Sequence, residues 1–367
     1  MTHIVVLGAG YSGLVAAKLA ARRTGSTVTL VNARETFVER VRMHQLASGQ
    51  ALPERPIKDL VTGTGVEFVA DQVVRIDPAS GTVVLSGREL RYDVLIYALG
   101  SRADLTSVPG ASEYAYTVAD VDHARKLRDR LRRPGSVAIV GGGLTGIEAA
   151  TELAETYPDR VVKLVTSGTL GANLSDRGRR HLRRTFARLG IDLIENARVA
   201  AVDGDGLKLE DGDQVAGDVV VWTTGFEVSP LATEAGFAVD PHGRMQVDAT
   251  LRSTSHPDVY AVGDAAAVHR STGQELRMAC ATGLPAAACA VRSLNARLDG
   301  REAKPLRFRY LNQCISLGRN DALIQFVHAD DSRRKTVLTG RAAARYKETI
   351  IRLAYLTQRR PGLTVLT

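Results

Sequence analysis

The chain has 367 residues, of which 44% are hydrophobic and 24% charged, so it can bury a full core and is long enough for two or three domains. No apolar run approaches the length of a membrane span, and the residues after Met1-Thr2-His3 resemble a strand rather than a secretory signal. The three cysteines are too few, and odd in number, for a disulfide scaffold. We therefore expect a globular cytoplasmic protein.

The formal net charge is +8, mostly from arginines spread along predicted helices, as in the stretch 177–188. A solvated helix face is the ordinary explanation for such a stretch, with nucleic acid or anionic lipid as the alternative. We expect no nucleic-acid partner.

The first predicted elements are a strand at 4–7, the turn Gly8-Ala9-Gly10-Tyr11-Ser12-Gly13, a helix over 12–22 and a strand at 27–31. An irregular stretch at 34–51 follows. A short β unit over 66–90 then leads to a buried strand at 92–98, which ends in Leu99-Gly100-Ser101. A helix over 121–132 and the Pro134-Gly135 break complete this half.

The second half repeats that order. A strand at 137–140 leads into Gly141-Gly142-Gly143-Leu144-Thr145-Gly146, followed by helices over 146–156 and 175–189 and a strand at 161–165. A β unit over 199–215 and a strand at 218–222 end in Thr223-Thr224-Gly225. An isolated Gly-x-Gly-x-x-Gly is weak evidence, but two copies with the same later signal favour a common architecture.

The remaining residues depart from this pattern. A short strand at 259–262 ends on Gly263-Asp264, and an alanine-rich helix over 282–298 has Pro285 in its first turn, where a missing N–H is tolerated. Residues 307–367 are predicted to form several strands and a basic helix over 341–358.

Each glycine-rich turn has the form of strand, tight turn and helix N-terminus. Glycines allow the backbone to approach a pyrophosphate, and the free N–H groups and dipole of the following helix stabilise its charge. Two such turns predict two dinucleotides.

These motifs in this order resemble the two-dinucleotide-binding-domain flavoproteins of the pyridine nucleotide–disulfide oxidoreductase superfamily. Because it lacks a redox Cys pair and has the tail at 340–347, the chain is most similar to the type II NADH dehydrogenase and apoptosis-inducing-factor-like branch. The resemblance implies an α/β fold with two Rossmann-like domains, the second inserted in the first, and a small C-terminal α+β domain. The implied boundaries are 1–110 with 226–300 for FAD, 111–225 for NAD(P), and 301–367.

The resemblance further implies that FAD binds at the first turn and NADH or NADPH at the second. The residues implied to contact FAD are Gly8, Gly10, Tyr11, Ser12, Gly13, Asn32, Ala33, Val73, Ala98, Leu99, Gly100, Gly263, Asp264, Pro285 and Ala286. Those implied to contact the nicotinamide nucleotide are Gly141, Gly143, Leu144, Thr145, Gly146, Glu148, Thr166, Thr224 and Gly225.

The chain departs from the family pattern at both ribose positions. Asn32 stands where an acid is expected about 20 residues after the first turn, with Glu35 as a substitute. After the second turn, Thr166-Ser167-Gly168 offers neither an acid for NADH nor an arginine for a 2′-phosphate, so either nucleotide stays open.

Three side chains are candidates for catalysis, and no metal site is expected. Glu148 matches a family position near the nicotinamide, with a helix-start carboxylate as the alternative. Cys280 is a candidate redox thiol or a small buried hydrophobe. His44 lies in an unusual stretch with Arg40, Arg42 and Gln45, which could line an acceptor site or contact the FAD phosphates; for His44 a structural hydrogen bond is the stronger alternative.

We expect hydride transfer from a nicotinamide to FAD and then electron transfer to a quinone-like small molecule. The alternatives are a tailoring oxidoreductase of a biosynthetic pathway, or a flavin-binding redox sensor that acts through partners. The basic C-terminal helix either packs on its own domain or makes peripheral contact with the inner face of the membrane. A homodimer stays open.

Overall fold

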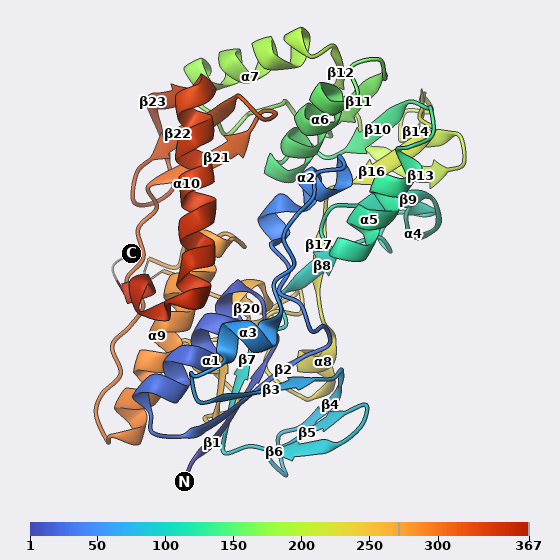
Figure 1. Ribbon diagram of the computed structural model, residues 1–367. Helices are drawn as coiled ribbons and strands as arrows, with labels where there is room; N and C mark the ends of the chain where they lie inside the picture. Colours follow the sequence, from blue (N-terminus) through green and yellow to red (C-terminus); the bar gives the residue numbers. More distant parts are fainter. Residues whose placement is uncertain (271, 366–367) are drawn as a thin grey trace.

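A computed structural model describes residues 1–270 and 272–365 and has three parts (Figure 1). The blue N-terminal part contains β1 (His3–Leu7), α1 (Tyr11–Arg23), β2 (Thr27–Asn32), η1 (Arg40–Arg42), α2 (Met43–Ala47), α3 (Ile57–Val61), β3 (Val66–Ala70), β4 (Val73–Asp77), β5 (Thr82–Leu85), β6 (Glu89–Arg91), β7 (Val94–Tyr97) and β8 (Ser101–Ala103).

The green part comprises α4 (Ala111–Tyr114), β9 (Ala115–Thr117), α5 (Val121–Arg130), β10 (Val137–Val140), α6 (Leu144–Thr156), β11 (Val162–Val165), α7 (Asp176–Arg188), β12 (Ile191–Ile194), β13 (Val199–Asp203), β14 (Gly206–Leu209), β15 (Gln214–Ala216) and β16 (Val219–Trp222). The rest contains β17 (Phe226–Val228), α8 (Leu231–Glu234), β18 (Met245–Gln246), β19 (Val259–Ala261), η2 (Gly263–Ala265), β20 (Ala266–Ala267), α9 (Cys280–Leu298), β21 (Asn312–Ser316), β22 (Ala322–Val327), β23 (Arg333–Thr339), α10 (Gly340–Arg359) and η3 (Pro361–Val365).

Two five-stranded parallel sheets share one plan. The first has the order β19-β7-β1-β2-β3 and the second the order β9-β16-β10-β11-β12. In each sheet the strand that precedes the glycine turn is central and buried on both faces, as continuous apolar strands are in parallel sheets. Because β19 joins the first sheet after the whole second sheet has been completed, the second Rossmann-like unit is inserted in the first.

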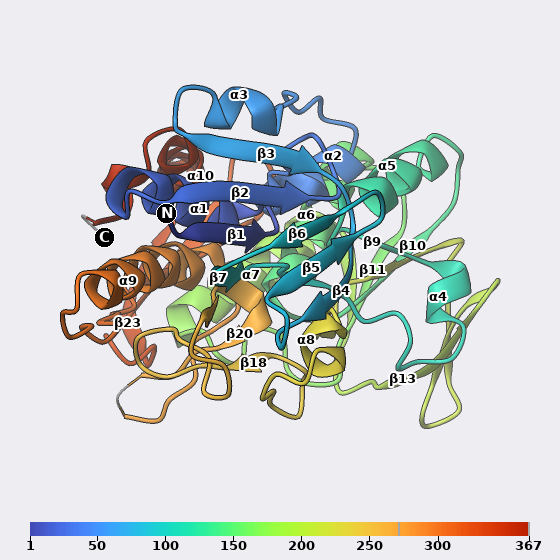
Figure 2. The same cartoon turned by 90° about the horizontal axis from the view of Figure 1, so that it is seen from below.

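Two antiparallel units flank these sheets. β4, β5 and β6 form one (Figure 2), and β13, β14 and β15 form the other. The predicted β unit over 66–90 was wrong at its start, because β3 pairs in parallel with β2 and belongs to the first main sheet. Alternating apolar residues do not reveal which neighbour a strand will pair with.

The C-terminal part confirms the predicted strands and basic helix. β21, β22 and β23 form an antiparallel sheet, and α10 packs against β22 and against α1 of the first part. No helix among residues 1–270 and 272–365 is both long and apolar enough to cross a bilayer.

The late helix begins earlier than predicted. α9 starts at Cys280, so Pro285 lies in its second turn rather than its first. Ala279 is extended, and Thr282 and Gly283 donate backbone hydrogen bonds to its carbonyl, which sets this start. The Pro285 ring therefore removes one intrahelical hydrogen bond instead of occupying a position that has none.

A buried lysine fastens the C-terminal helix to the first part. Lys18 of α1 is 4% exposed, and its Nζ donates to the carbonyls of Leu60 at 2.8 Å, Gln358 at 2.6 Å and Arg359 at 3.2 Å. Two of these acceptors are the last carbonyls of α10, which have no partner within the helix and carry its negative dipole end.

Lys18→Met is expected to lower the free energy of unfolding by about 1.5–3 kcal/mol, because three buried carbonyls lose a charged donor while the side-chain length is kept. Denaturant unfolding measures the change. Lys58→Met is the matched control, since Lys58 is exposed and its ammonium makes no hydrogen bond or ion pair within residues 1–270 and 272–365. An equal loss in both variants would contradict the role of Lys18.

Candidate active site

The first glycine turn joins β1 to α1 and leaves no room for side chains at two positions. Gly8 has φ +96°, and a Cβ there would overlap the Ala98 carbonyl; a Cβ at Gly13 would overlap the Gly8 carbonyl. At Gly10, by contrast, nothing lies within 4 Å of a Cβ position. The turn is thus packed from behind and open in front, which is the form of a cradle for a phosphate.

The second turn repeats this arrangement. A Cβ at Gly146 would overlap the Gly141 carbonyl, whereas Gly143 has nothing within 4 Å. The Thr223 hydroxyl donates to the Val140 carbonyl at 2.7 Å, and its side chain packs against Gly141. Thr166 packs equally closely against Gly142, at 2.5 Å from a Cβ position there.

The helices after both turns begin without capping side chains. Gly10 and Gly143 are the N-caps of α1 and α6, and neither helix has an acidic residue in its first turn. In contrast, Asp120 caps α5 and Ser175 caps α7 through side-chain oxygens, and both of those helices carry an early aspartate. The free N–H groups of α1 and α6 are therefore available to an anion.

The end of β2 supports the first turn. Asn32 Oδ1 accepts from the Ala9 N–H at 2.9 Å, and its Nδ2 donates to the Arg34 carbonyl at 2.8 Å. Asn32 therefore holds the turn in place, while Ala33 and Glu35 are exposed beside it.

Asp264 lies where the sequence places it, beside the first turn, but it already has partners. Its Oδ2 accepts from Ser101 Oγ at 2.7 Å and lies 3.4 Å from Arg40 Nη1. The preceding Gly263 packs against the Ser12 side chain, with 2.9 Å between a Cβ position and Oγ. Arg40 thus joins its own segment to those of Ser101 and Asp264. The sequence analysis named Arg40 only as one of several polar residues in its stretch.

Arg42 is held elsewhere. Its guanidinium contacts Glu39 at 3.2 Å, Gln45 at 3.1 Å and Glu348 of α10 at 2.7 Å. Burial alone would lower the pKa of Arg42, but the two glutamates raise it above its usual value. The arginine that approaches the Gly-Asp pair is Arg40, and we propose it for the FAD site in place of Arg42.

The other candidates occupy varied positions. Tyr11 directs its ring into the core, 5.0 Å from that of Phe37, so only its backbone faces the turn. Ala286 is buried in α9, and Gly283 of the same helix lies close to Ser12 and Gly263. Ala98, Leu99 and Gly100 follow β7, Val73 begins β4, Leu144 and Thr145 begin α6, and Thr224 and Gly225 follow β16.

A cavity of about 630 Å³ opens in front of the second turn. Its volume lies within the usual range for cofactor sites, about 300–1,000 Å³. The C-terminal sheet closes it from the other side, so its lining comes from two parts of the chain: Gly142, Gly143, Leu144, Ile147, Thr169, Gly171, Ala172, Asn173, Leu174, Arg277, Gln313, Ile315, Asp331, Ser332 and Arg333.

Glu148 lies just behind this cavity in a buried ion pair. Its Oε1 bonds Lys347 Nζ of α10 and accepts from the Ser316 N–H at 3.0 Å, and the two charged side chains are 13% and 10% exposed. Burial would raise the pKa of Glu148, but Lys347, His44 and the Ser316 N–H together lower it below its usual value. Glu148 is therefore not a mere helix-start carboxylate.

His44 packs against this pair from α2. Its Nδ1 is 3.8 Å from Glu148 Oε2, too far for a hydrogen bond, and its Nε2 is buried without a partner among the described residues. Burial lowers the pKa of His44 to about 4, with Lys347 and Arg42 acting in the same direction against Glu148. His44 is therefore neutral at pH 7.

The three cysteines are free thiols in the structure. Burial raises the pKa of Cys280 to about 12 and that of Cys314 to about 11, and it also raises the pKa of Cys289. Because the thiolate is the reactive form, none is activated for disulfide chemistry.

Cys280→Ala is accordingly expected to leave steady-state turnover within about twofold of wild type, because the residue serves as a small, half-buried apolar side chain packed against the core. Turnover with NADH and a quinone measures this, and Cys289→Ala is the matched control. A loss of an order of magnitude confined to Cys280→Ala would restore the redox role.

The sequence analysis missed Lys347 and Ser316 as partners of Glu148. Lys347 is one of several basic residues on a predicted helix, and its pattern does not distinguish it from the exposed ones. Ser101 was also missed, as a partner of Asp264, because a serine after a strand does not by itself indicate a binding site.

Known proteins are similar to this chain over most of its length. Residues 2–292 match the pyridine nucleotide-disulphide oxidoreductase family. An NADH dehydrogenase-like protein of Mycobacterium tuberculosis is 29% identical, over 95% of this chain and 93% of its own length. An alternative NAD(P)H-ubiquinone oxidoreductase of Arabidopsis thaliana is 28% identical, over 88% of this chain and 72% of its own. A demethylphylloquinone reductase of Synechocystis is 25% identical, over 88% and 86%.

Solved structures confirm the fold. The sulfide:quinone oxidoreductase of Aquifex aeolicus superposes with a TM-score of 0.86 at 19% identity, over 98% of this chain and 92% of its own. NDH2 of Plasmodium falciparum in complex with NADH superposes with a TM-score of 0.81 at 14% identity, over 98% and 97%. With the family match over residues 2–292, the chain belongs to the pyridine nucleotide-disulphide oxidoreductase family and is an NAD(P)H oxidoreductase.

Proposed function

We propose that this protein is an FAD-dependent NAD(P)H oxidoreductase that delivers electrons to a quinone. The observation that carries the proposal is the pair of glycine turns, each closed behind, open in front and followed by an uncapped helix N-terminus. The relatives named for ubiquinone and demethylphylloquinone support a quinone as the acceptor class.

The residues around the first turn fit FAD. Gly10 offers an open approach for the pyrophosphate, and Asp264 with Arg40 and Ser101 lies beside the turn for the ribityl chain or phosphates. The second turn, with the cavity of about 630 Å³ in front of it, would hold NADH or NADPH. When bound, FAD supplies the two-electron chemistry that accepts a hydride and passes electrons on.

The protein's own residues would exclude water from the site and supply a proton. Ile147 and Ile315 present apolar side chains to the nucleotide cavity and exclude water from it. Forming a quinol also consumes protons, and Lys347 Nζ holds one against Glu148 Oε1, directly behind that wall. We propose that this pair supplies a proton and that neutral His44 keeps it desolvated.

Anaerobic titration tests the proposal. The purified protein is expected to be yellow, to bleach with NADH or NADPH, and to reoxidise rapidly with menadione. A protein that cannot be reconstituted with FAD would contradict the cofactor. Bleaching without reoxidation by any quinone would favour a tailoring oxidoreductase, and slow reduction with a persistent charge-transfer band would favour a sensor.

Peripheral membrane contact and a homodimer stay predictions. α10 buries Lys347, Ile351 and Gln358 and stacks Arg55 on Tyr355 at 4.1 Å, so much of its surface is already packed. Leu353 is 51% exposed on the remaining face. Flotation with anionic vesicles would test peripheral membrane contact, and light scattering would test for a homodimer.

A further inference from the structure

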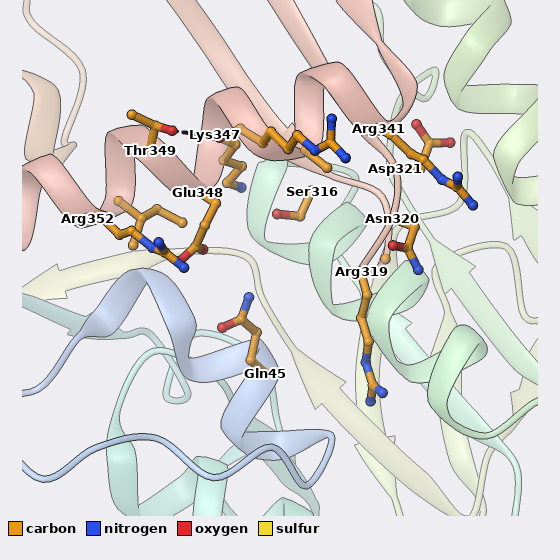
Figure 3. A pocket seen from close by; sticks show the side chains of 14 residues that line it. Gln45, Ser316, Arg319, Asn320, Asp321, Arg341, Lys347, Glu348, Thr349 and Arg352 are labelled. Carbon is orange, nitrogen blue, oxygen red and sulfur yellow. Dashed lines mark hydrogen bonds and ion pairs between the residues drawn. The ribbon is translucent and has the colours of Figure 1, made fainter.

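A second cavity lies on the far side of the Glu148 ion pair. It has a volume of about 480 Å³ and is bounded by Gln45 of α2, the turn between β21 and β22, and α10 from Arg341 to Arg352 (Figure 3). This volume also lies within the usual range for small-molecule sites. The proposed function does not account for this cavity.

The two cavities share a wall one layer of residues thick. Gln313 and Ile315 of β21 line the nucleotide cavity, whereas Ser316 lines the second one, as alternating side chains of a strand would. Ser316 and Lys347, which line the second cavity, are the residues that hold Glu148. A ligand bound there would therefore lie next to the Glu148 pair.

The acidic residues of this lining are already neutralised. Glu348 accepts from Arg42 at 2.7 Å and from Arg352 at 2.8 Å. Figure 3 shows Glu348 and Arg352 at one end of the cavity. Asp321, at the other end, accepts from the Gly340 N–H at 3.0 Å, contacts His181 at 2.9 Å and lies 3.4 Å from Arg188 Nη2. Neither carboxylate is available to balance further positive charge.

The lining of this cavity contains more basic residues than acidic ones. Lys347 is paired with Glu148, and Arg319 is 3.4 Å from Glu152. Arg341 and Arg345 also line the cavity, but their guanidinium groups make no ion pair or hydrogen bond within residues 1–270 and 272–365. Two unpaired guanidinium groups one helical turn apart, at positions i and i+4, suit an anion with more than one charge.

We propose that this second cavity binds a small water-soluble anion carrying at least two negative charges, as carboxylates or as a phosphate, through Arg341 and Arg345. Three elements border the volume of about 480 Å³, which suits a small molecule rather than a macromolecular surface. The inference does not rest on the redox activity, because the site contacts the ion pair and not the glycine turns.

Isothermal titration calorimetry on the flavin-loaded protein tests this, with citrate and inorganic phosphate as probes at constant ionic strength. Saturable binding of at least one probe is expected, and the Arg341→Ala/Arg345→Ala variant should bind it at least about tenfold more weakly, a difference of about 1.4 kcal/mol. Tighter binding of citrate would identify a polycarboxylate, and tighter binding of phosphate a phosphate ester.

Arg184→Ala is the matched control, since Arg184 is an exposed arginine of α7 that forms no ion pair with any residue that the structure describes. It should bind the probe as wild type does, and all variants should bind NADH equally under anaerobic conditions. Saturating NADH should leave probe binding intact, because it fills the other cavity. Absence of saturable binding up to about 10 mM, equal binding by the double variant, or displacement by NADH would overturn the proposal.

Discussion

Gly10→Ala is expected to remove bound FAD while leaving the protein folded, and Gly13→Ala is expected to destabilise the fold itself. Gly10 has φ −72° and ψ −172°, which alanine adopts freely, and nothing lies within 4 Å of its Cβ position. A methyl group there projects into the open front of the turn. At Gly13 the methyl group would overlap the Gly8 carbonyl, so the turn must break or shift, at a cost of several kcal/mol.

The second turn provides the matched pair. Gly143 has φ −75° and ψ 179° and an open Cβ position, so Gly143→Ala should fold and retain flavin while its Kd for NADH rises at least about tenfold. Gly146→Ala should be destabilised as Gly13→Ala is, because its methyl group would overlap the Gly141 carbonyl.

Flavin absorbance after gel filtration, thermal unfolding and anaerobic NADH binding together measure these four variants. The separation of effects tests the assignment of each turn to one cofactor. Flavin loss in Gly143→Ala with flavin retained in Gly10→Ala would invert the assignment. Unfolding of both Gly10→Ala and Gly143→Ala would show that the fronts of the turns are structural.

The sequence could predict those features of the fold that depend on interactions between residues close together in the chain. Gly8, Gly13, Gly141 and Gly146 are needed for backbone reasons that act within a few residues, and the apolar strands before them have few other structures open to them. The repeated order of elements then predicted two Rossmann-like units, which the sheets confirm. The predicted β unit over 66–90 was wrong at its start, because the pairing of β3 with β2 joins distant segments. The predicted start of α9 was two residues late, because the local hydrogen bonds to the Ala279 carbonyl were not evident from the sequence.

The candidate site was predicted only where a single motif defines a residue. Glu148 could be singled out because it matches a position of the family motif, but Lys347 lies 199 residues later and meets it only because α10 folds back over β21. Similarly, Arg40 and Arg42 are nearly adjacent, yet one contacts Asp264 and the other Glu348. Ion pairs of this kind are set by tertiary structure, and spacing in the chain does not encode them.

The second large effect is expected from Glu148. Glu148→Gln keeps the shape of the side chain but leaves the Lys347 ammonium buried without a counter-charge. Removing one partner of a buried pair typically costs about 3–5 kcal/mol, so the free energy of unfolding should fall by that order. Turnover with NADH and a quinone should fall at least about tenfold if the pair supplies a proton.

The pH dependence of stability gives an independent signature. The pKa of Glu148 is lower in the folded protein than in the unfolded chain, so its carboxylate stabilises the fold above the ordinary glutamate pKa. That contribution is lost as the pH falls through the lower folded value. Wild type should therefore lose more stability on acidification below about pH 4.5 than Glu148→Gln does. Equal acid slopes would contradict a charged Glu148.

The double variant Glu148→Gln/Lys347→Met separates structure from catalysis. It removes both buried charges together, so no ion is left without a partner, and stability should return to within about 1–2 kcal/mol of wild type. If the pair holds a proton for the acceptor, turnover stays low although the fold has recovered, and the loss appears in kcat with little change in the Kd for NADH. If turnover recovers along with stability, Glu148 and Lys347 only join α6 to α10, and the proton must come from elsewhere.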